Sequence, residues 1–82
     1  MIHTLKAWPA AFRAVKNGTK THEIRVADRP YAVGDSLLLH EWDNVTGAYT
    51  GYLCLVEVTF ITPGGEWGLP DNLCVMSIRK EK

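Results

Sequence analysis

Residues 36–61, SLLLHEWDNVTGAYTGYLCLVEVTFI, decide the fold of this chain. Three leucines open the segment, and a turn-prone stretch at residues 44–47 divides it into two apolar runs. In the second run, residues 52–61, Cys54, Val56, Val58 and Phe60 alternate with other residues, as expected of a strand with one buried face. The segment therefore predicts an antiparallel hairpin of two long strands, 36–43 and 52–61.

The flanking sequence adds shorter elements to this hairpin. Pro9 suits the first turn of a helix over residues 9–17, and Gly18 is a natural stop. Trp8, Phe12 and Val15 share one helical face, so we expect all three to contribute to the core, with Phe12 packing on Val56, Val58, Phe60 and Ile78. Further strands are predicted at residues 2–7, 21–26 and 73–79, with a long loop over 62–72. Five or six strands and one short N-terminal helix predict a mainly β (α+β) fold, a small β-barrel forming a single domain over residues 1–82.

The charge is balanced overall but unevenly distributed. Residues 1–30 hold six basic and two acidic side chains, residues 31–78 hold six acidic and no basic ones, and the net charge is zero. This distribution has two interpretations. The basic residues could form a face that attracts phosphate, or they could pair with the acidic strands inside the domain. The composition excludes a strongly basic nucleic-acid binder, and no apolar run is long enough to span a membrane. Cys54 and Cys74 read as buried free thiols, which favours the cytoplasm.

The most charged segment is Gly18-Thr-Lys-Thr-His-Glu-Ile-Arg25, followed by Arg29. On a regular strand Thr21, Glu23 and Arg25 share one face, and Lys20 joins them only from an irregular turn after Gly18. One interpretation is a binding site in which the basic side chains contact phosphate or base edges and Glu23 orients Lys20 or accepts a hydrogen bond. The other is a structural salt bridge in the barrel wall.

The histidines and the loop aromatics are the remaining candidates for a metal or ligand site. His3, His22 and His40 lack the spacing of metal ligands, so neither a metal nor a cofactor is expected. Trp42 and Tyr49 flank the hairpin loop and could stack on bases, although aromatics at such positions also cap barrel ends.

Seven short motifs occur in an order that resembles a known family. They are His3-x-Leu5-Lys6, Trp8-Pro9, Gly18-x-Lys20-Thr21-x-Glu23-Ile24-Arg25, Asp28-Arg29, Val33-Gly34-Asp35, Glu41-Trp42 and Tyr49-Thr50-Gly51. The chain is similar to the small bacterial and phage proteins of the DUF3850 type, within the ASCH (activating signal cointegrator homology) group of the PUA-like superfamily. The resemblance implies a PUA-like β-barrel, a cleft lined by the Gly18–Arg25 motif, and binding of RNA or a nucleotide-like ligand.

The same resemblance raises an enzymatic alternative. Some similar ASCH proteins hydrolyse the amide of an N4-acetylated cytidine nucleoside with a Lys, a Thr three residues later and a Glu from a later helix. Lys20 matches that Lys, but Glu23 stands at the Thr position and residues 36–61 leave no room for the helix. The expected function is therefore ligand binding through Lys20, Thr21, Glu23, Arg25, Arg29, Trp42 and Tyr49. An amidohydrolase using Lys20 with Glu23 or Glu41, and a protein-interaction module with a purely structural motif, are the alternatives.

Overall fold

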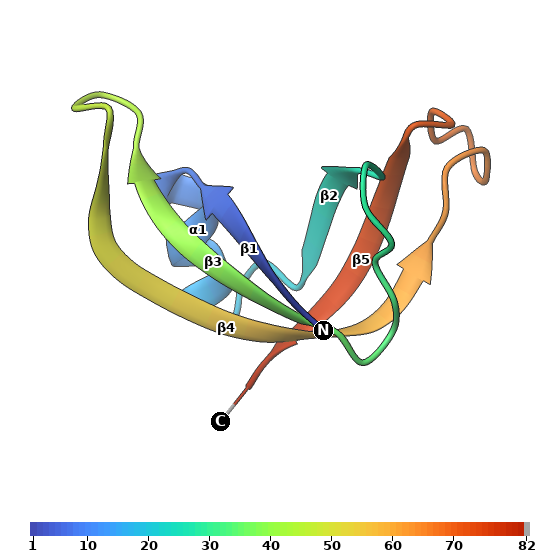
Figure 1. The fold of residues 1–82 in the computed structure, drawn as a ribbon, viewed down its shortest axis with the longest axis horizontal. Helices are drawn as coiled ribbons and strands as arrows, with labels where there is room; N and C mark the ends of the chain where they lie inside the picture. The colour runs from blue at the N-terminus through green and yellow to red at the C-terminus, as the bar shows by residue number, and fades with distance from the viewer. Residues whose placement is uncertain (82) are drawn as a thin grey trace.

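The chain folds as one curled sheet with a short helix against it. A computed structural model describes residues 1–81. In chain order the elements are β1 (Ile2–Ala7), α1 (Pro9–Lys16), β2 (His22–Val26), β3 (Ser36–Asp43), β4 (Ala48–Thr62) and β5 (Leu73–Lys80). The strands lie in the order β1-β3-β4-β5-β2, so β1 and β2 form the two edges. Figure 1 shows the sheet bent into an open half-barrel, with α1 behind β1 and β3. The predicted mainly β fold with one short helix is confirmed.

The β3–β4 hairpin is the centre of the sheet, as predicted. Its antiparallel register runs from Ser36 opposite Glu57 to Asp43 opposite Ala48. The turn is closed by the Asp43 side chain, which accepts hydrogen bonds from the amides of Val45 and Thr46 at 2.8 and 3.2 Å. Because pairing continues to this turn, β4 begins at Ala48, four residues earlier than expected.

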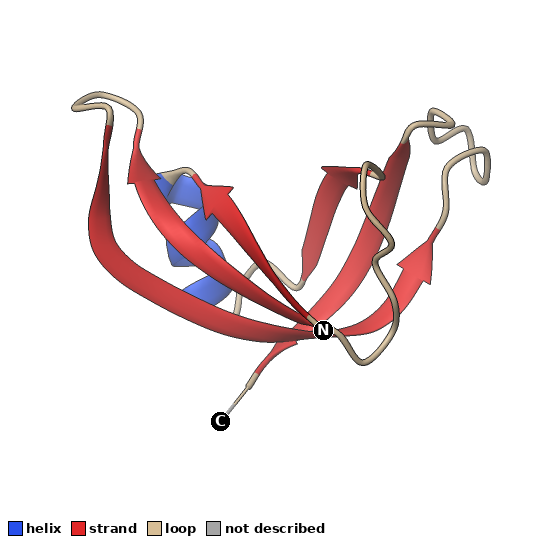
Figure 2. Cartoon of the chain, in the orientation of Figure 1, coloured by secondary structure: helices blue, strands red, loops and turns tan. Residues whose placement is uncertain are grey.

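Strand β1 adds the one pairing that the local pattern does not indicate. It runs parallel to β3, with Leu5 opposite Leu39, whereas all other ladders are antiparallel. A parallel pair needs a crossover between its strands, and α1 and β2 lie in that connection. The helix packs on β3 and β4, and Figure 2 shows it behind β1 in this view.

The core lies between α1 and the concave side of the sheet. Phe12 and Val15 of α1 are almost fully buried there. They join apolar side chains from four strands, namely Leu5, Ala7, Leu37, Leu39, Cys54, Val56, Val58, Cys74, Met76 and Ile78. Cys54 and Cys74 are free, as expected, and burial raises the pKa of the Cys74 thiol, which disfavours a reactive thiolate.

Two core predictions are wrong. Phe60 is 63% exposed because the β4–β5 register shifts between Val58 and Phe60, and this bulge turns Phe60 to the outer face. Trp8 is 59% exposed because it is the N-cap residue of α1, with extended backbone, and so lies outside the helical face formed by Phe12 and Val15.

The helix of the described chain is too short and too polar to cross a membrane.

Candidate functional site

The turn after α1 places Lys20 outside the regular strand. Gly18 has a φ of +87°, a conformation that glycine adopts at little cost. The amides of Thr19 and Lys20 both donate to the carbonyl of Ala14, at 2.9 and 3.0 Å. This irregular backbone is the condition that strand alternation sets for Lys20 to reach Glu23.

Glu23 is the centre of a compact ionic cluster. It lies on the inner face of β2, its side chain is only 6% exposed, and both carboxylate oxygens are occupied. Oε1 accepts from Lys20 Nζ at 2.8 Å, and Oε2 accepts from Arg25 Nε at 2.9 Å. Lys20 Nζ also donates to the carbonyl of His22 at 2.6 Å. Two cations around one carboxylate give this cluster, Lys20–Glu23–Arg25, a net charge of +1.

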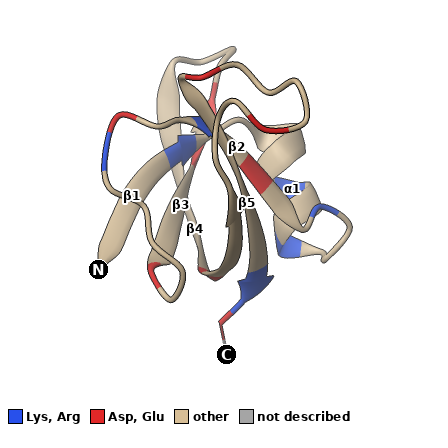
Figure 3. Ribbon diagram, turned by 90° about the vertical axis from the view of Figure 1, so that its right-hand side faces the viewer, with Lys and Arg blue, Asp and Glu red and all other residues tan. Residues whose placement is uncertain are grey.

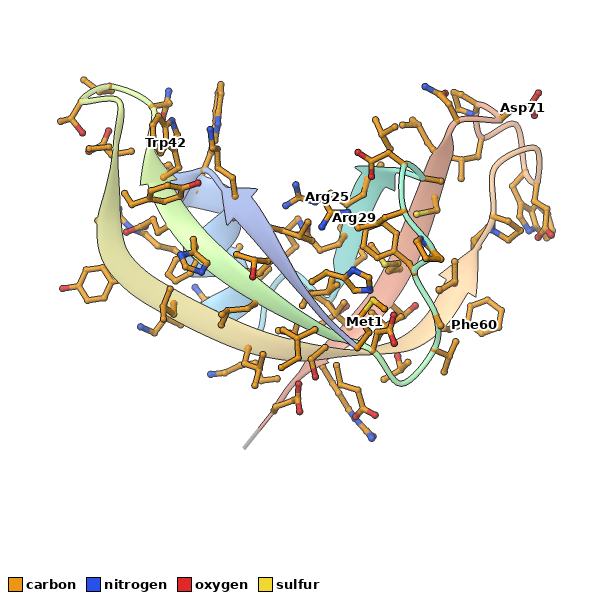
Figure 4. All side chains as sticks on the ribbon, viewed as in Figure 1. Met1, Arg25, Arg29, Trp42, Phe60 and Asp71 are labelled. Atoms are coloured by element: carbon orange, nitrogen blue, oxygen red, sulfur yellow. The ribbon has the colours of Figure 1, made fainter. Side chains whose placement is uncertain are left out.

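Arg25 connects the two edges of the half-barrel. Its Nη2 donates to the carbonyl of Lys6 on β1 at 2.8 Å, while its Nε is bound to Glu23 on β2. Figure 4 shows this side chain extending from β2 into the space beside β1. The guanidinium therefore bridges part of the gap that the open sheet leaves.

Two adjoining pockets lie along this gap and share Ile24 and Arg25. One, of about 300 Å³, is lined by residues that include Lys6, Trp8, Lys20, Glu23 and Arg25. The other, of about 410 Å³, is lined by residues that include Leu5, Arg25, Arg29 and Tyr31. We call the two pockets together the edge cleft. Lys20, Glu23, Arg25 and Arg29, four of the predicted ligand-binding residues, line it.

The remaining predicted residues lie outside the edge cleft. Thr21 lines a third pocket near the end of β5, which shares Lys20 with the edge cleft, and the Thr21 carbonyl accepts from the Ile78 amide at 3.0 Å. Trp42 and Tyr49 face each other across β3 and β4, with ring centroids 4.9 Å apart. Lys6, which lines the cleft, contacts this pair, since its Nζ lies 4.0 Å from the centroid of the Trp42 ring.

Glu41, the alternative acid/base candidate, is not brought to Lys20. It is almost fully buried, and its Oε1 accepts from the Thr50 hydroxyl at 2.8 Å. Its Oε2 lies 3.4 Å from Arg13 Nε and makes no hydrogen bond within residues 1–81. The register shift between His40 and Trp42 places Glu41 at an irregular point of the β3–β4 ladder. Its position supports a structural pairing with α1.

Lys6, Trp8 and Tyr31 also line the cleft, although the sequence did not single them out as ligand-binding residues. The helical spacing of Trp8 had assigned it to the core instead. Burial raises the pKa of Tyr31, so its hydroxyl stays protonated and available as a donor at neutral pH. The Cζ of Arg29 lies 5.8 Å from the centroid of the Tyr31 ring, and its Nε lies 3.5 Å from Asp28 Oδ1.

A second polar cluster lies at the start of β3. His3 Nε2 is 2.7 Å from Asp35 Oδ2, and the Ala32 amide donates to the same oxygen at 3.0 Å. The hydrogen bond with His3 is the main cause that holds the pKa of Asp35 below its ordinary value. The His3 ring also lies 4.7 Å from that of Tyr31, so this cluster supports one wall of the edge cleft.

The basic N-terminal part pairs both within itself and with later acidic residues. Lys20 and Arg25 pair with Glu23, and Arg29 pairs with Asp28. The Met1 amino group and His3 contact Asp35, and Arg13 pairs with Glu41. Figure 3 accordingly shows blue and red segments intermixed around β2 and the nearby loops rather than separated into two faces. Across residues 1–81 no group of three or more His, Cys, Asp or Glu side chains is arranged to hold a metal ion.

Comparison with known proteins places the chain in a family. Residues 2–78 match the family described as "Domain of unknown function (DUF3850)". The chain is also 39% identical over 66 residues to an uncharacterized 12.9 kDa protein in the GpA 3′ region of Escherichia phage P2. That match covers 80% of this chain but only 59% of the phage protein. With nearly its whole length matched, the chain belongs to the DUF3850 family.

Proposed function

We propose that this domain is a PUA-like, ASCH-type domain that binds RNA or a nucleotide-like ligand in the edge cleft. The curled five-stranded sheet with one short helix is compatible with the fold that the sequence resemblance implies. The function rests on one observation, the Lys20–Glu23–Arg25 cluster, which presents cationic donors to an open pocket.

The donor count supports an acceptor-rich ligand. A guanidinium has five N–H donors and an ammonium has three. Arg25 uses two of its donors on Glu23 and Lys6, and Lys20 uses two on Glu23 and His22, within the described chain. Three donors of Arg25 and one of Lys20 therefore remain. Phosphate oxygens match such a set, since arginine binds them through two parallel hydrogen bonds.

Two roles were considered for Glu23, orienting Lys20 and accepting a hydrogen bond from the ligand. Its hydrogen bonds to Lys20 and Arg25 support the first, in which Glu23 holds the two cations in place. This pairing also agrees with a structural role for the motif. The two roles are compatible, because the Lys20 and Arg25 side chains remain 23% and 25% exposed.

A binding titration tests this proposal. Fluorescence anisotropy of a labelled single-stranded RNA should show saturable binding that weakens about ten-fold between 50 and 200 mM salt, as two or three phosphate contacts predict. Lys20→Ala should weaken binding at least about ten-fold, because one charge-assisted hydrogen bond is worth about 1.5–3 kcal/mol.

Arg79→Ala is the matched control, since Arg79 pairs with Glu57 outside the edge cleft. It should bind like the wild-type protein. An absence of binding to RNA and nucleotides, or equal losses in both variants, would exclude the edge cleft as the binding site.

A further inference from the structure

The edge cleft combines recessed cations with an exposed aromatic ring. About three quarters of the Lys20 and Arg25 side chains is covered, whereas Trp8, in the same pocket, is 59% exposed. The Lys20 and Arg25 side chains are therefore more covered than the indole that lines the same pocket. A ligand that contacts all three must enter this pocket.

The dimensions of the cleft suit a small unit of nucleic acid. Its two pockets, of about 300 and 410 Å³, fall at the lower end of the range for small-molecule sites. Arg25 lies between them, because it lines both. A phosphate bound at Arg25 would thus have room for a sugar and a base on the Trp8 side.

Duplex RNA does not satisfy this geometry. In a duplex the bases are stacked and paired, and proteins reach it through its shape, its phosphates and its 2′-hydroxyls. Those groups lie on a convex surface, which cannot bring a phosphate to recessed donors and a base face to Trp8 together. An unpaired nucleotide can do both, since its base is free to stack on an aromatic side chain.

We propose that the edge cleft binds one unpaired nucleotide, either free or within a single strand, with its phosphate on Lys20 and Arg25 and its base on Trp8. This inference rests on the proposed function and narrows it to a ligand class. The Trp42–Tyr49 pair then has no part in the first contact, because it lies outside both pockets.

The ligand form is tested by competition. A labelled single-stranded RNA is displaced by the unlabelled strand, by the same strand annealed to its complement, by a nucleoside 5′-monophosphate and by inorganic phosphate. The single strand should compete at least ten-fold better than the duplex, and the nucleotide better than phosphate. Duplex that competes as well as single strand, or phosphate that competes as well as the nucleotide, would overturn the inference while leaving the proposed function intact.

The base position is tested with the tryptophans. Trp8→Leu should weaken single-strand binding about 5- to 150-fold, the range for loss of one stacked base. Trp8→Phe should restore part of the affinity, and Trp67→Leu, at a 95% exposed site, should have no effect. Should Trp8→Leu fail to fold, ligand-induced fluorescence quenching decides the matter: it should vanish in Trp8→Phe and persist in Trp67→Phe.

Quenching that persists in folded Trp8→Phe would overturn the base assignment. If no nucleotide or RNA binds at all, both the proposed function and this inference fail. If RNA binds and depends on Lys20 but not on Trp8, only the inference fails.

Discussion

Replacing Glu23 by Gln should destabilise the fold strongly, although the two side chains have nearly the same shape. The Gln side chain keeps one oxygen that can accept a hydrogen bond from Lys20 or Arg25. Its NH₂ group, which only donates, faces the other cation, so that cation loses its acceptor. The loss of one charge-assisted hydrogen bond costs about 1.5–3 kcal/mol. Breaking a buried ion pair costs up to about 3–5 kcal/mol, which must be reduced here because both cations are partly exposed.

We therefore expect a loss of about 2–4 kcal/mol from Glu23→Gln. The total stability of a domain of this length is only about 4–12 kcal/mol, so the midpoint of thermal unfolding should fall by about 10–30 °C. Circular dichroism during heating and urea titration measures both quantities. Glu57→Gln is the matched control, because the Glu57–Arg79 pair is exposed and should contribute less than about 1 kcal/mol. Equal losses in the two variants would refute the assignment of Glu23 as a buried counter-ion.

The same substitution separates preorganisation from net charge. Glu23→Gln raises the charge of the cluster by one, which alone would favour an anionic ligand. It also releases Lys20 and Arg25 from their fixed positions, and ordering them again on binding costs conformational entropy. We expect weaker nucleotide binding at temperatures where the variant is folded. Tighter binding would show that charge, rather than position, controls affinity.

Three other predictions concern the core, acid stability and catalysis. Phe12→Ala should lower the free energy of unfolding by about 3–5 kcal/mol and Phe60→Ala by less than about 1 kcal/mol, because Phe12 is buried and Phe60 is exposed. Equal urea midpoints for the two variants would contradict the outward orientation of Phe60 at the β4 bulge. The pKa of Asp35 is lowered in the folded protein, so its carboxylate contributes to stability fully above about pH 4, and this contribution is lost as the pH falls through the folded pKa. Asp35→Asn should therefore be less stable than the wild-type protein at pH 7 and should lose less stability on acidification. Equal acid sensitivity of the two proteins would show that the hydrogen bond between His3 and Asp35 does not stabilise the fold. Purified protein should release no acetate from N4-acetylcytidine, and turnover that disappears in Lys20→Met would instead establish an amidohydrolase.

Local patterns were sufficient for the elements and for the inward face of β2. Alternation alone placed Glu23 and Arg25 on one side of the strand, and Gly18 indicated the irregular turn that brings Lys20 to them. These features depend on backbone geometry over a few residues. The sequence contains that information directly, because side chains of a strand alternate and glycine permits a positive φ.

The features that the sequence left open or predicted wrongly depend on contacts between distant segments. The parallel β1–β3 ladder brings Leu5 next to Leu39, and no local signal specifies a parallel partner. The exposure of Phe60 depends on one extra residue between Val58 and Phe60, which reverses the side chain without changing the composition of the strand. Trp8 belongs to the helical pattern by spacing but not by conformation, since it precedes the first turn.

The bridge formed by Arg25 implies that the proposed binding role and the folding role of this motif would be difficult to separate. Its Nε is fixed by Glu23 on β2 and its Nη2 by the Lys6 carbonyl on β1, so one side chain both joins the sheet edges and presents donors to the cleft. A salt bridge that served the fold alone would need no open pocket on either side of the guanidinium. A binding residue that served the ligand alone would need no backbone partner across the gap. Arg25 has both an open pocket on each side and a backbone partner across the gap. The proposed ligand contact would therefore draw its rigidity from the same hydrogen bonds that bridge the two edges of the half-barrel.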